Sequence, residues 1–175
     1  MDYNNCPKCG EKYFFKKKET KFEEFFLCKK CKYKFYNNPK SAVVGLVINN
    51  ENKILLVRRA IEPYKKYWDL PGGFVNSSEE PDLAIIREIK EELDISVSVI
   101  NIEGAFLEEY KNKGRNNEIY KVIILVYKLQ INNPNKTMQA MDDIDKYKFF
   151  DCQKLPKNIA FPEKKSFLIK YFNKK

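Results

Sequence analysis

The chain has 175 residues, of which 43% are hydrophobic and 14% aromatic, and its formal net charge is +9. This composition excludes a disordered chain, and the absence of histidine excludes Ser-His-Asp catalysis and every histidine-bearing metal site. No apolar run approaches the roughly 20 residues that a membrane helix needs, and no apolar signal segment follows the first methionine. We therefore expect a cytoplasmic protein that has no membrane partner.

Four of the five cysteines form two Cys-x2-Cys pairs near the start of the chain, Cys6 with Cys9 and Cys28 with Cys31. This spacing lets the two thiolates of each pair face one ion, which is typical of a tetrahedral zinc site. Because sulfur fills all four positions, the zinc would be structural. The alternatives are disulfides, which are rare without a signal segment, and a redox pair, which needs only one Cys-x2-Cys.

The segment between the two pairs predicts two short strands joined by a polar turn, over residues 12–27. Residues 1–38 therefore resemble a zinc ribbon, a module too small to build much core, which the metal would hold folded. Residues 1–40 also carry 11 lysines and only 5 acidic residues. Such a basic segment could attract nucleic acid, although lysine and asparagine are abundant throughout the chain. The rest, residues 39–175, is expected to form a second domain.

Strands are predicted along most of this second domain. Residues 41–48 and 53–59 predict a β-hairpin around a polar turn. A short strand over 67–70 ends at the Pro-Gly-Gly sequence at 71–73, which we interpret as a break. The other predicted strands cover residues 96–110, 118–131 and 146–152. Cys152, at the end of the last one, is expected to be a small core residue.

Two helices are predicted from their start signals and their apolar spacing. Glu79 and Glu80 precede Pro81, and acidic residues and proline both favour the first turn of a helix. Apolar residues then recur at helical spacing as far as Leu93. Pro162 starts the second helix, whose inward-facing residues are Phe167, Leu168, Tyr171 and Phe172. The order of strands and helices indicates an α/β fold, a mixed sheet with helices on its faces.

One side of the first helix carries three carboxylates, because Glu88, Glu91 and Glu92 lie at i, i+3 and i+4. Like charges at this spacing destabilise a helix. Arg87 could neutralise part of the charge, and a hard divalent cation, Mg²⁺ or Mn²⁺, could neutralise the rest through oxygen ligands. The two glycines ahead of the helix let the backbone come close enough for a carbonyl to join such a site. A solvated acidic face is the alternative.

The segment GFVNSSEEPDLAIIREIKEELDI, residues 73–95, resembles the Nudix box G-x5-E-x7-R-E-U-x-E-E-x-G-U, in which U is aliphatic. The matching residues are Gly73, Glu79, Arg87, Glu88, Ile89, Glu91, Glu92 and Ile95. Asp94 stands where the family has glycine, and Asp tolerates the left-handed conformation expected there. The resemblance extends over about residues 41–175, and a zinc ribbon ahead of a Nudix domain is similar to the arrangement in NADH pyrophosphatases.

The resemblance implies a Nudix α/β/α sandwich that hydrolyses a nucleoside diphosphate linked to a second moiety, with Mg²⁺ or Mn²⁺ as cofactor. The metal ligands that it implies are Gly72, through its carbonyl, Glu88, Glu91 and Glu92. The catalytic residues that it implies are Glu79, Arg87, Glu88 and Glu91, among which Glu79 and Arg87 would orient the loop and the helix. The general base stays open between Glu88, Asp142 and Asp143.

The identity of the substrate is less defined than the chemistry. Arg58, Arg59 or Lys65 could hold phosphate, and Tyr110 and Phe161 could stack on a base, although an aromatic residue in a strand is more often part of the core. An S-Q-P-W-P-F-P-like motif, typical of NADH pyrophosphatases, is missing, which argues against assigning NADH outright. The expected substrates are therefore ADP-ribose, NAD(H) or a nucleotide sugar.

Two further expectations concern partners. A non-catalytic nucleotide- or RNA-binding module that uses the Nudix fold and the basic ribbon is the alternative to an enzyme. The two functions are compatible, because capped RNA ends are themselves diphosphate substrates. The resemblance also implies a homodimer, as in many members of the family.

Overall fold

The computed structural model describes residues 5–12, 14–18, 24–112 and 118–173. The chain divides into two compact units, residues 1–39 and 40–175. The boundary lies one residue beyond the predicted one, immediately before the first strand of the second unit. No helix in the described part of the chain combines the length and the apolar character that crossing a membrane requires.

The first unit is a three-stranded antiparallel sheet. Its strands are β1 (Phe14–Lys18), β2 (Glu24–Cys28) and β3 (Lys34–Tyr36), in that spatial order. β1 and β2 are the two strands predicted between the cysteine pairs. Among its described residues, Phe26 and Phe35 pack beside the cysteines, and Phe25 is fully buried as well. A unit of about 40 residues usually needs a metal or a cross-link to fold.

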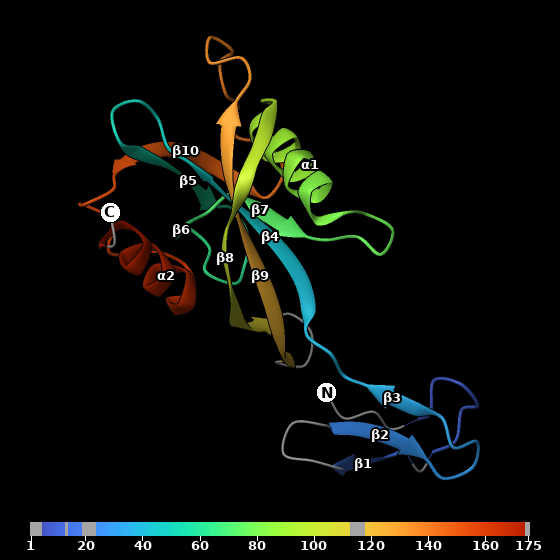
Figure 1. Ribbon diagram of the computed structural model, residues 1–175. Coiled ribbons are helices and arrows are strands. Elements are labelled where there is room, and N and C mark those ends of the chain that lie inside the picture. Colours follow the sequence, from blue (N-terminus) through green and yellow to red (C-terminus); the bar gives the residue numbers. More distant parts are fainter. Residues whose placement is uncertain (1–4, 13, 19–23, 113–117, 174–175) are drawn as a thin grey trace. The chain divides into compact units, whose positions relative to one another are not determined.

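In its described residues, the second unit contains two sheets between two helices (Figure 1). Its strands are β4 (Lys40–Val47), β5 (Lys53–Arg59), β6 (Trp68–Asp69), β7 (Gly72–Phe74), β8 (Val97–Asn112), β9 (Glu118–Ile131) and β10 (Ile144–Asp151). The mixed sheet has the order β7-β4-β9-β8, and β4 runs parallel to β9. The other sheet is antiparallel, in the order β10-β5-β6.

The predicted β-hairpin over 41–59 is wrong except at its closed end. Ile48 and Ile54 form a single bridge, and the Asn49 amide donates to the Lys53 carbonyl at 3.0 Å. Beyond this point β4 and β5 diverge into different sheets, where β9 and β10 are their long partners. Both strands are apolar on two faces, which is typical of strands buried between layers.

The predicted break at 71–73 is instead a crossing from one sheet to the other. β6 pairs with β5, and β7 then pairs antiparallel with β4. Gly72 adopts a φ of +140°, and a Cβ there would lie 2.2 Å from the Val43 carbonyl oxygen. Only glycine fits this crossing, because any side chain would collide with the β4 backbone.

The two helices, α1 (Pro81–Leu93) and α2 (Pro162–Asn173), lie on opposite sides of the strands (Figure 1). Strand residues alternate between two core clusters: on β4, Val43 and Val47 belong to the cluster with α1, whereas Val44 and Leu46 belong to the other. The predicted α/β/α arrangement around a mixed sheet is therefore confirmed.

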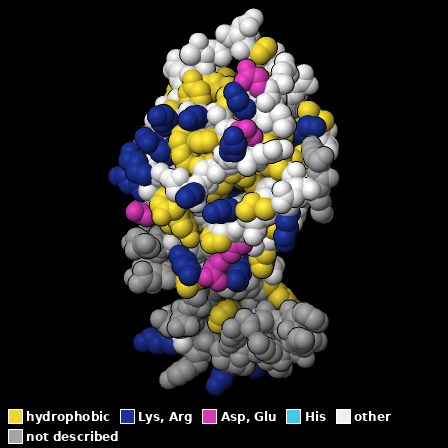
Figure 2. All heavy atoms as spheres, turned by 90° about the vertical axis from the view of Figure 1, so that its left-hand side faces the viewer, with side chains coloured by type: hydrophobic (Ala, Val, Ile, Leu, Met, Phe, Trp, Pro, Cys, Tyr) yellow, Lys and Arg dark blue, Asp and Glu magenta, His cyan; other side chains and the backbone are white. Residues whose placement is uncertain are grey.

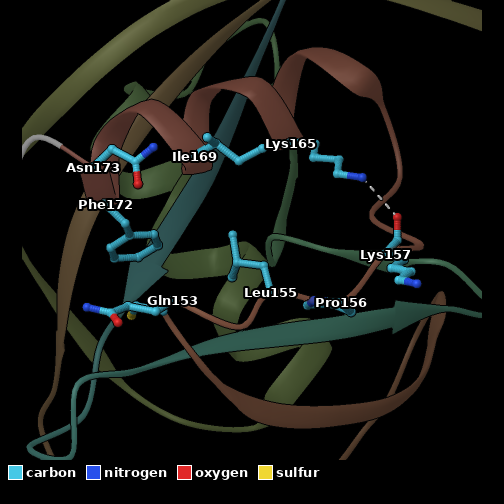
Figure 3. Close-up of a pocket in the computed structure, with 9 residues that line it drawn as sticks. Gln153, Leu155, Pro156, Lys157, Lys165, Ile169, Phe172 and Asn173 are labelled. Carbon is cyan, nitrogen blue, oxygen red and sulfur yellow. Dashed lines mark hydrogen bonds between the residues drawn. The ribbon is translucent and has the colours of Figure 1, made fainter.

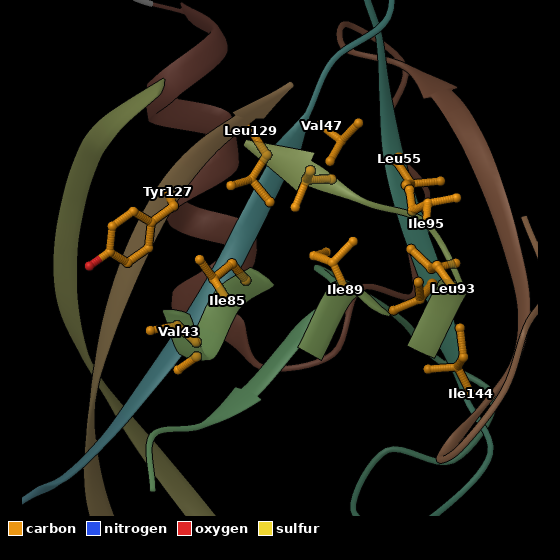
Figure 4. Packing of buried hydrophobic residues seen from close by; sticks show 13 residues of the cluster. Val43, Val47, Leu55, Ile85, Ile89, Leu93, Ile95, Tyr127, Leu129 and Ile144 are labelled. Carbon is orange, nitrogen blue, oxygen red and sulfur yellow. The ribbon is translucent and has the colours of Figure 1, made fainter. Parts of the chain in front are cut away.

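The core on the α1 side fixes the rotation of this helix. Ile85, Ile89 and Leu93 are fully buried against β4, β5 and β9 (Figure 4). Burying an aliphatic side chain of this size contributes about 1.5–3 kcal/mol. Three such residues on one side of α1 therefore decide which way its carboxylates point.

The core on the α2 side contains the inward-facing residues that the sequence predicts. Leu168 is fully buried, and Phe167, Tyr171 and Phe172 pack around the same cluster. Cys152 is 4% exposed in this cluster, which confirms its prediction as a core residue. This packing holds the first turn of α2, with Lys164, against the strands.

Candidate active site and metal sites

The loop ahead of α1 folds one acidic side chain back toward the helix. Glu80 is the N-cap, in an extended conformation, and Pro81 takes the first helical position, where its missing N–H costs nothing. The amide and the side chain of Asn76 both donate to Oε2 of Glu79 at 3.2 Å. The Glu79 carboxylate is thereby fixed where it meets Arg87.

Arg87 connects this loop to the acidic side of α1. Its Nε and Nη2 donate to the two carboxylate oxygens of Glu79 at 2.7 and 2.9 Å, a bidentate pair. Nη2 also donates to the Phe74 carbonyl at 3.2 Å, and Nη1 donates to Glu88 at 2.7 Å and to Glu91 at 2.9 Å. The guanidinium lowers the pKa of Glu79 to about 2. Arg87 and Glu79 together brace the loop, β7 and the helix.

The three carboxylates of α1 have different surroundings. Glu88 lies against Gly73, where a Cβ would come within 2.6 Å of the carboxylate, so this approach requires glycine. Glu92 is 4% exposed and accepts a hydrogen bond from the Gly72 amide at 3.0 Å. The Glu91 side chain is 47% exposed. Burial raises the pKa of Glu88, and it raises the pKa of Glu92 well above its usual range.

Glu88 and Glu92 have the chemistry of a divalent-cation site. Desolvation makes the ionised form of each carboxyl less stable. The nearby charge of Asp143 further raises the pKa of both. Mg²⁺ takes oxygen ligands, and proteins usually bind it through one or two carboxylates together with substrate phosphates. One buried and one partly buried carboxylate beside a backbone crossing fit that requirement.

Asp94, the one departure from the box, ends α1 in the left-handed conformation, with φ 53° and ψ 31°. Its carboxylate pairs with Lys90 on the helix and with Lys136 on the loop between β9 and β10, the latter at 2.7 Å. The two lysines lower the pKa of Asp94 to about 2. The aspartate therefore takes the conformation that the family glycine would take, and it ties the loop to the helix.

This loop between β9 and β10 also caps α1 and brings one aspartate to the site. The amides of Gln139 and Met141 donate to the carbonyls of Leu93 and Glu92 at 3.1 and 2.9 Å. Two residues farther along the chain lies Asp143, which is partly buried and has a raised pKa because of that burial.

A pocket of about 280 Å³ opens beside Glu88 and the Gly72–Gly73 crossing. One group of its lining residues is polar or belongs to the crossing: Arg59, Asp69, Gly72, Gly73, Glu108, Asp143 and Lys164. The others are apolar or aromatic: Ala42, Val43, Val44, Ile61, Phe74, Tyr110, Val122, Ile124 and Phe161. A ligand with a flat apolar part and one charged end suits a pocket with an apolar group and a polar group of lining residues.

The pocket includes some of the expected substrate residues and not others. Arg59 lines it, whereas Arg58 donates to Asp145 at 2.7 Å and does not line it, nor does the exposed Lys65. Asp143 lines it and the exposed Asp142 does not. Tyr110 and Phe161 both line it, but Phe161 is only 1% exposed and supports the wall from behind.

Comparison with known proteins agrees with this geometry. A family model described as the NUDIX domain matches residues 38–171. The chain belongs to the Nudix family. An ADP-ribose pyrophosphatase from Methanocaldococcus jannaschii is 37% identical over 134 residues, which is 77% of this chain and 74% of the relative.

Other relatives match with smaller coverage or lower identity. An RNA pyrophosphohydrolase from Orientia tsutsugamushi is 36% identical over 74 residues, 42% of this chain and 46% of the relative. The crystal structure of a NUDIX hydrolase from Nitrosomonas europaea aligns with a TM-score of 0.75 at 23% identity, over 99% of this chain and 92% of that one. The family match and the 37% identical relative make the chain a Nudix pyrophosphohydrolase.

Three charged residues in the pocket of the Nudix domain were not anticipated: Asp69, Glu108 and Lys164. They are 3%, 2% and 6% exposed. One signal could have identified Glu108, because it lies two residues before Tyr110 and side chains at i and i+2 share a face of a strand.

The four cysteines of the first unit form a compact cluster. The Sγ atoms of Cys6 and Cys31 are 3.7 Å apart, and those of Cys9 and Cys28 are 3.6 Å apart. A tetrahedron with Zn–S bonds of about 2.3 Å places its sulfurs roughly 3.8 Å apart. Among the described residues, no other group of three or more acidic or cysteine side chains converges to within 4.8 Å. The cluster therefore fits zinc.

A second pocket of the Nudix domain, about 450 Å³, lies between α2 and the segment before it (Figure 3). Phe172 and Ile169 point into it from α2, opposite Leu155 and Gln153, and Lys165 donates to the Lys157 carbonyl at 3.2 Å. None of the described residues that line it is a carboxylate. It therefore lacks the groups that metal-assisted hydrolysis needs.

Proposed function

We propose that this Nudix pyrophosphohydrolase depends on Mg²⁺ or Mn²⁺ and cleaves the diphosphate of a nucleoside diphosphate linked to a second moiety. The observation that carries this proposal is the placement of the buried Glu92 and the partly buried Glu88 at the Gly72–Gly73 crossing, beside a pocket of about 280 Å³. ADP-ribose, NAD(H) and nucleotide sugars are the substrates that we expect. The 37% identical ADP-ribose pyrophosphatase supports ADP-ribose as the first to test.

Each residue of the site has a separate task in this proposal. Glu88 and Glu92 are the main ligands of the divalent cations, and Glu91 and the Gly72 carbonyl complete the set. Bound there, the cations would neutralise the diphosphate oxygens and lower the pKa of the attacking water. Arg87, held by Glu79, keeps the helix and β7 at a fixed separation.

Two of the pocket's residues would act on the substrate directly. Arg59 supplies a positive charge for the phosphates. Asp143 or Glu88 takes the proton from the attacking water. Burial raises the pKa of both carboxyls, which brings them closer to the neutral range in which a general base works best.

The experiment is a substrate panel of ADP-ribose, NADH, a nucleotide sugar, a dinucleoside polyphosphate and nucleoside triphosphates, with release of the monophosphate as the signal. Activity is expected with Mg²⁺ or Mn²⁺ and not in EDTA. Glu92→Gln should lower it about 10³-fold. Glu109→Gln is the matched control, because Glu109 pairs with Lys121 at 2.9 Å on the other face of its strand. No turnover with either metal would refute the proposal.

We also propose that Cys6, Cys9, Cys28 and Cys31 bind one structural zinc ion. The Sγ separations of 3.6 and 3.7 Å support this. Metal analysis should find one zinc per chain, retained after mild oxidation, and Cys28→Ser should lose it. Oxidation of the cysteines with loss of zinc at low oxidant would favour the redox alternative instead.

The second candidate function is a non-catalytic nucleotide- or RNA-binding module. The lysine-rich segment at 1–40 favours RNA binding, and the relative named an RNA pyrophosphohydrolase supports RNA as the ligand. On the face of the Nudix domain in Figure 2, however, Lys and Arg side chains are spread among hydrophobic ones. This function predicts salt-sensitive RNA binding that weakens when the ribbon lysines are neutralised. Binding without turnover on the whole panel would select it.

A further inference from the structure

The interior of the pocket holds a buried ionic group that the diphosphate chemistry does not use. Lys164 donates to both oxygens of Asp69, at 3.0 and 3.1 Å. Asp69 also accepts hydrogen bonds from the Leu70 amide at 2.8 Å and from Arg59 at 3.3 Å. Asp69 is thus fully satisfied, and Lys164 is committed mainly to it.

Glu108, beside them, is not satisfied. It is 2% exposed, and its Oε2 has no hydrogen-bond partner among the described residues. The nearest cation, Nζ of Lys164, is 3.9 Å from this oxygen, beyond hydrogen-bond distance. A buried acceptor without a donor is destabilising, and native proteins rarely contain one that has no functional reason. Because Glu108 lines the pocket, a ligand can supply the missing donor.

The surroundings of Glu108 indicate which part of a ligand lies there. Phe74 is 39% exposed, and its ring meets Tyr110 edge-on with centroids 6.0 Å apart. The neighbouring positions on β4 and β9 are aliphatic: Ala42, Val44, Val122 and Ile124. An aromatic wall over an apolar floor suits a flat base, whereas a sugar with several hydroxyls would leave them unpaired. A carboxylate at the end of such a slot accepts from an N–H on the edge of the base.

We propose that Glu108 is a specificity residue that accepts a hydrogen bond from the exocyclic amino group of the nucleotide base, as in adenine. This inference rests on the proposed function for the nature of the ligand. Hypoxanthine carries a carbonyl oxygen where adenine carries the amino group, so the carboxylate would repel it. Burial raises the pKa of Glu108 to about 7, so the group is ionised above that pH.

The test is equilibrium binding of ADP-ribose and of inosine diphosphate ribose by calorimetry, in EDTA so that no turnover occurs, at about pH 8.5, above the pKa of about 7. The wild type should bind the amino base at least about tenfold more tightly, the value of one hydrogen bond to a charged group. Glu108→Gln should bring the two affinities within about threefold, because an amide both donates and accepts. Glu109→Gln should keep the wild-type ratio.

A further variant and a separate readout complete the experiment. Glu108→Met keeps the volume and removes the acceptor, so it should also lose the preference; thermal unfolding verifies that each variant is folded. Equal binding of the two ligands by the wild type, or an unchanged ratio in both Glu108 variants, would overturn the inference. A retained preference for the amino base without turnover in Mg²⁺ would overturn only the proposed function.

Discussion

Two groups of carboxylates in the Nudix domain have opposite electrostatics. The paired acids, Glu79 and Asp94, are held by Arg87 or by two lysines near the surface, and their pKa values are lowered to about 2. The buried acids, Glu92 and Glu108, lie in the interior, where desolvation raises their pKa values. Glu79 in the first group and both members of the second group are glutamates, so the difference between their pKa values comes from their surroundings.

The comparison separates residues that build the site from residues that work in it. A paired acid is most stable when ionised, so it stabilises the fold at neutral pH. A buried acid destabilises the fold when ionised, and it becomes favourable only when a ligand supplies a cation or a donor. Substitution of a paired acid or its partner should therefore reduce stability, whereas substitution of a buried acid should reduce function.

The largest effect is expected for Glu92→Gln. Turnover in Mg²⁺ should fall about 10³-fold, because metal stabilisation of the transition state is worth several kcal/mol. Stability in EDTA should not fall, since glutamine still accepts from the Gly72 amide and carries no buried charge. Turnover and thermal unfolding in EDTA measure both parts. A large loss of stability would place Glu92 with the paired acids and contradict the division into two groups.

The next effect is the pH dependence of stability, which should have opposite signs in the two groups. The pKa of Glu108 is raised, so its contribution to the free energy of unfolding is fully present below about pH 4.5. That contribution is lost as the pH rises through about 7. Relative to Glu108→Gln, the wild type should lose at most about 3 kcal/mol between these limits. The charged groups that face Glu108 are Arg59 on β5, Asp69 on β6, and Glu163 and Lys164 on α2.

At Glu79 the dependence of stability on pH has the opposite sign. Its pKa is lowered to about 2, so its contribution is present above about 4.5 and is lost as pH falls toward 2. Chemical unfolding of the wild type and Glu79→Gln across this range measures it. Parallel pH profiles for the Glu79 and Glu108 variants would contradict the division into two groups.

Arg87→Gln should have a smaller effect on stability, about 1–3 kcal/mol, because the loss of one guanidinium leaves three carboxylates without their shared partner. Activity should fall as well, since the helix and β7 lose their brace. Arg58→Gln serves as the control: it breaks the pair with Asp145 and touches neither group of acids. Equal stability losses in the two variants would show that the brace is an ordinary surface ion pair.

The smallest effect is expected for Asp94→Gly, which restores the family residue. Glycine fits the left-handed conformation better, but the ion pairs with Lys90 and Lys136 are lost, so the two effects on stability should largely cancel. Asp94→Ala loses the pairs without gaining conformational freedom and should be the less stable of the two. Denaturant unfolding can rank them.

The parts of the fold that the sequence predicted are those fixed by local spacing. The limits of α1 follow from Pro81, the apolar positions and the residue after Leu93, all within one helix. The cysteine cluster likewise follows from two short spacings. The hairpin over 41–59 failed because the parallel pairing of β4 with β9 joins residues about 80 positions apart, such as Ala42 and Ile124, which no local pattern records.

The interior of the pocket was beyond prediction for a related reason. Glu108 and Glu109 are adjacent and identical, yet one is 2% exposed and the other pairs with surface lysines. Which of them points inward depends on the register of β8, and β8 is shifted against β9 at two irregularities before this point. Lys164 is similar, since only the packing of α2 on the strands brings it beside Asp69.

The most direct test of the account is a calorimetric titration of Mn²⁺ into the wild type and into Glu92→Gln. Glu88 and Glu92 are proposed as a cation site, so the wild type should bind Mn²⁺ and the variant should bind it at least about tenfold more weakly. Unchanged Mn²⁺ affinity in the variant would contradict the assignment of these two carboxylates as the metal ligands.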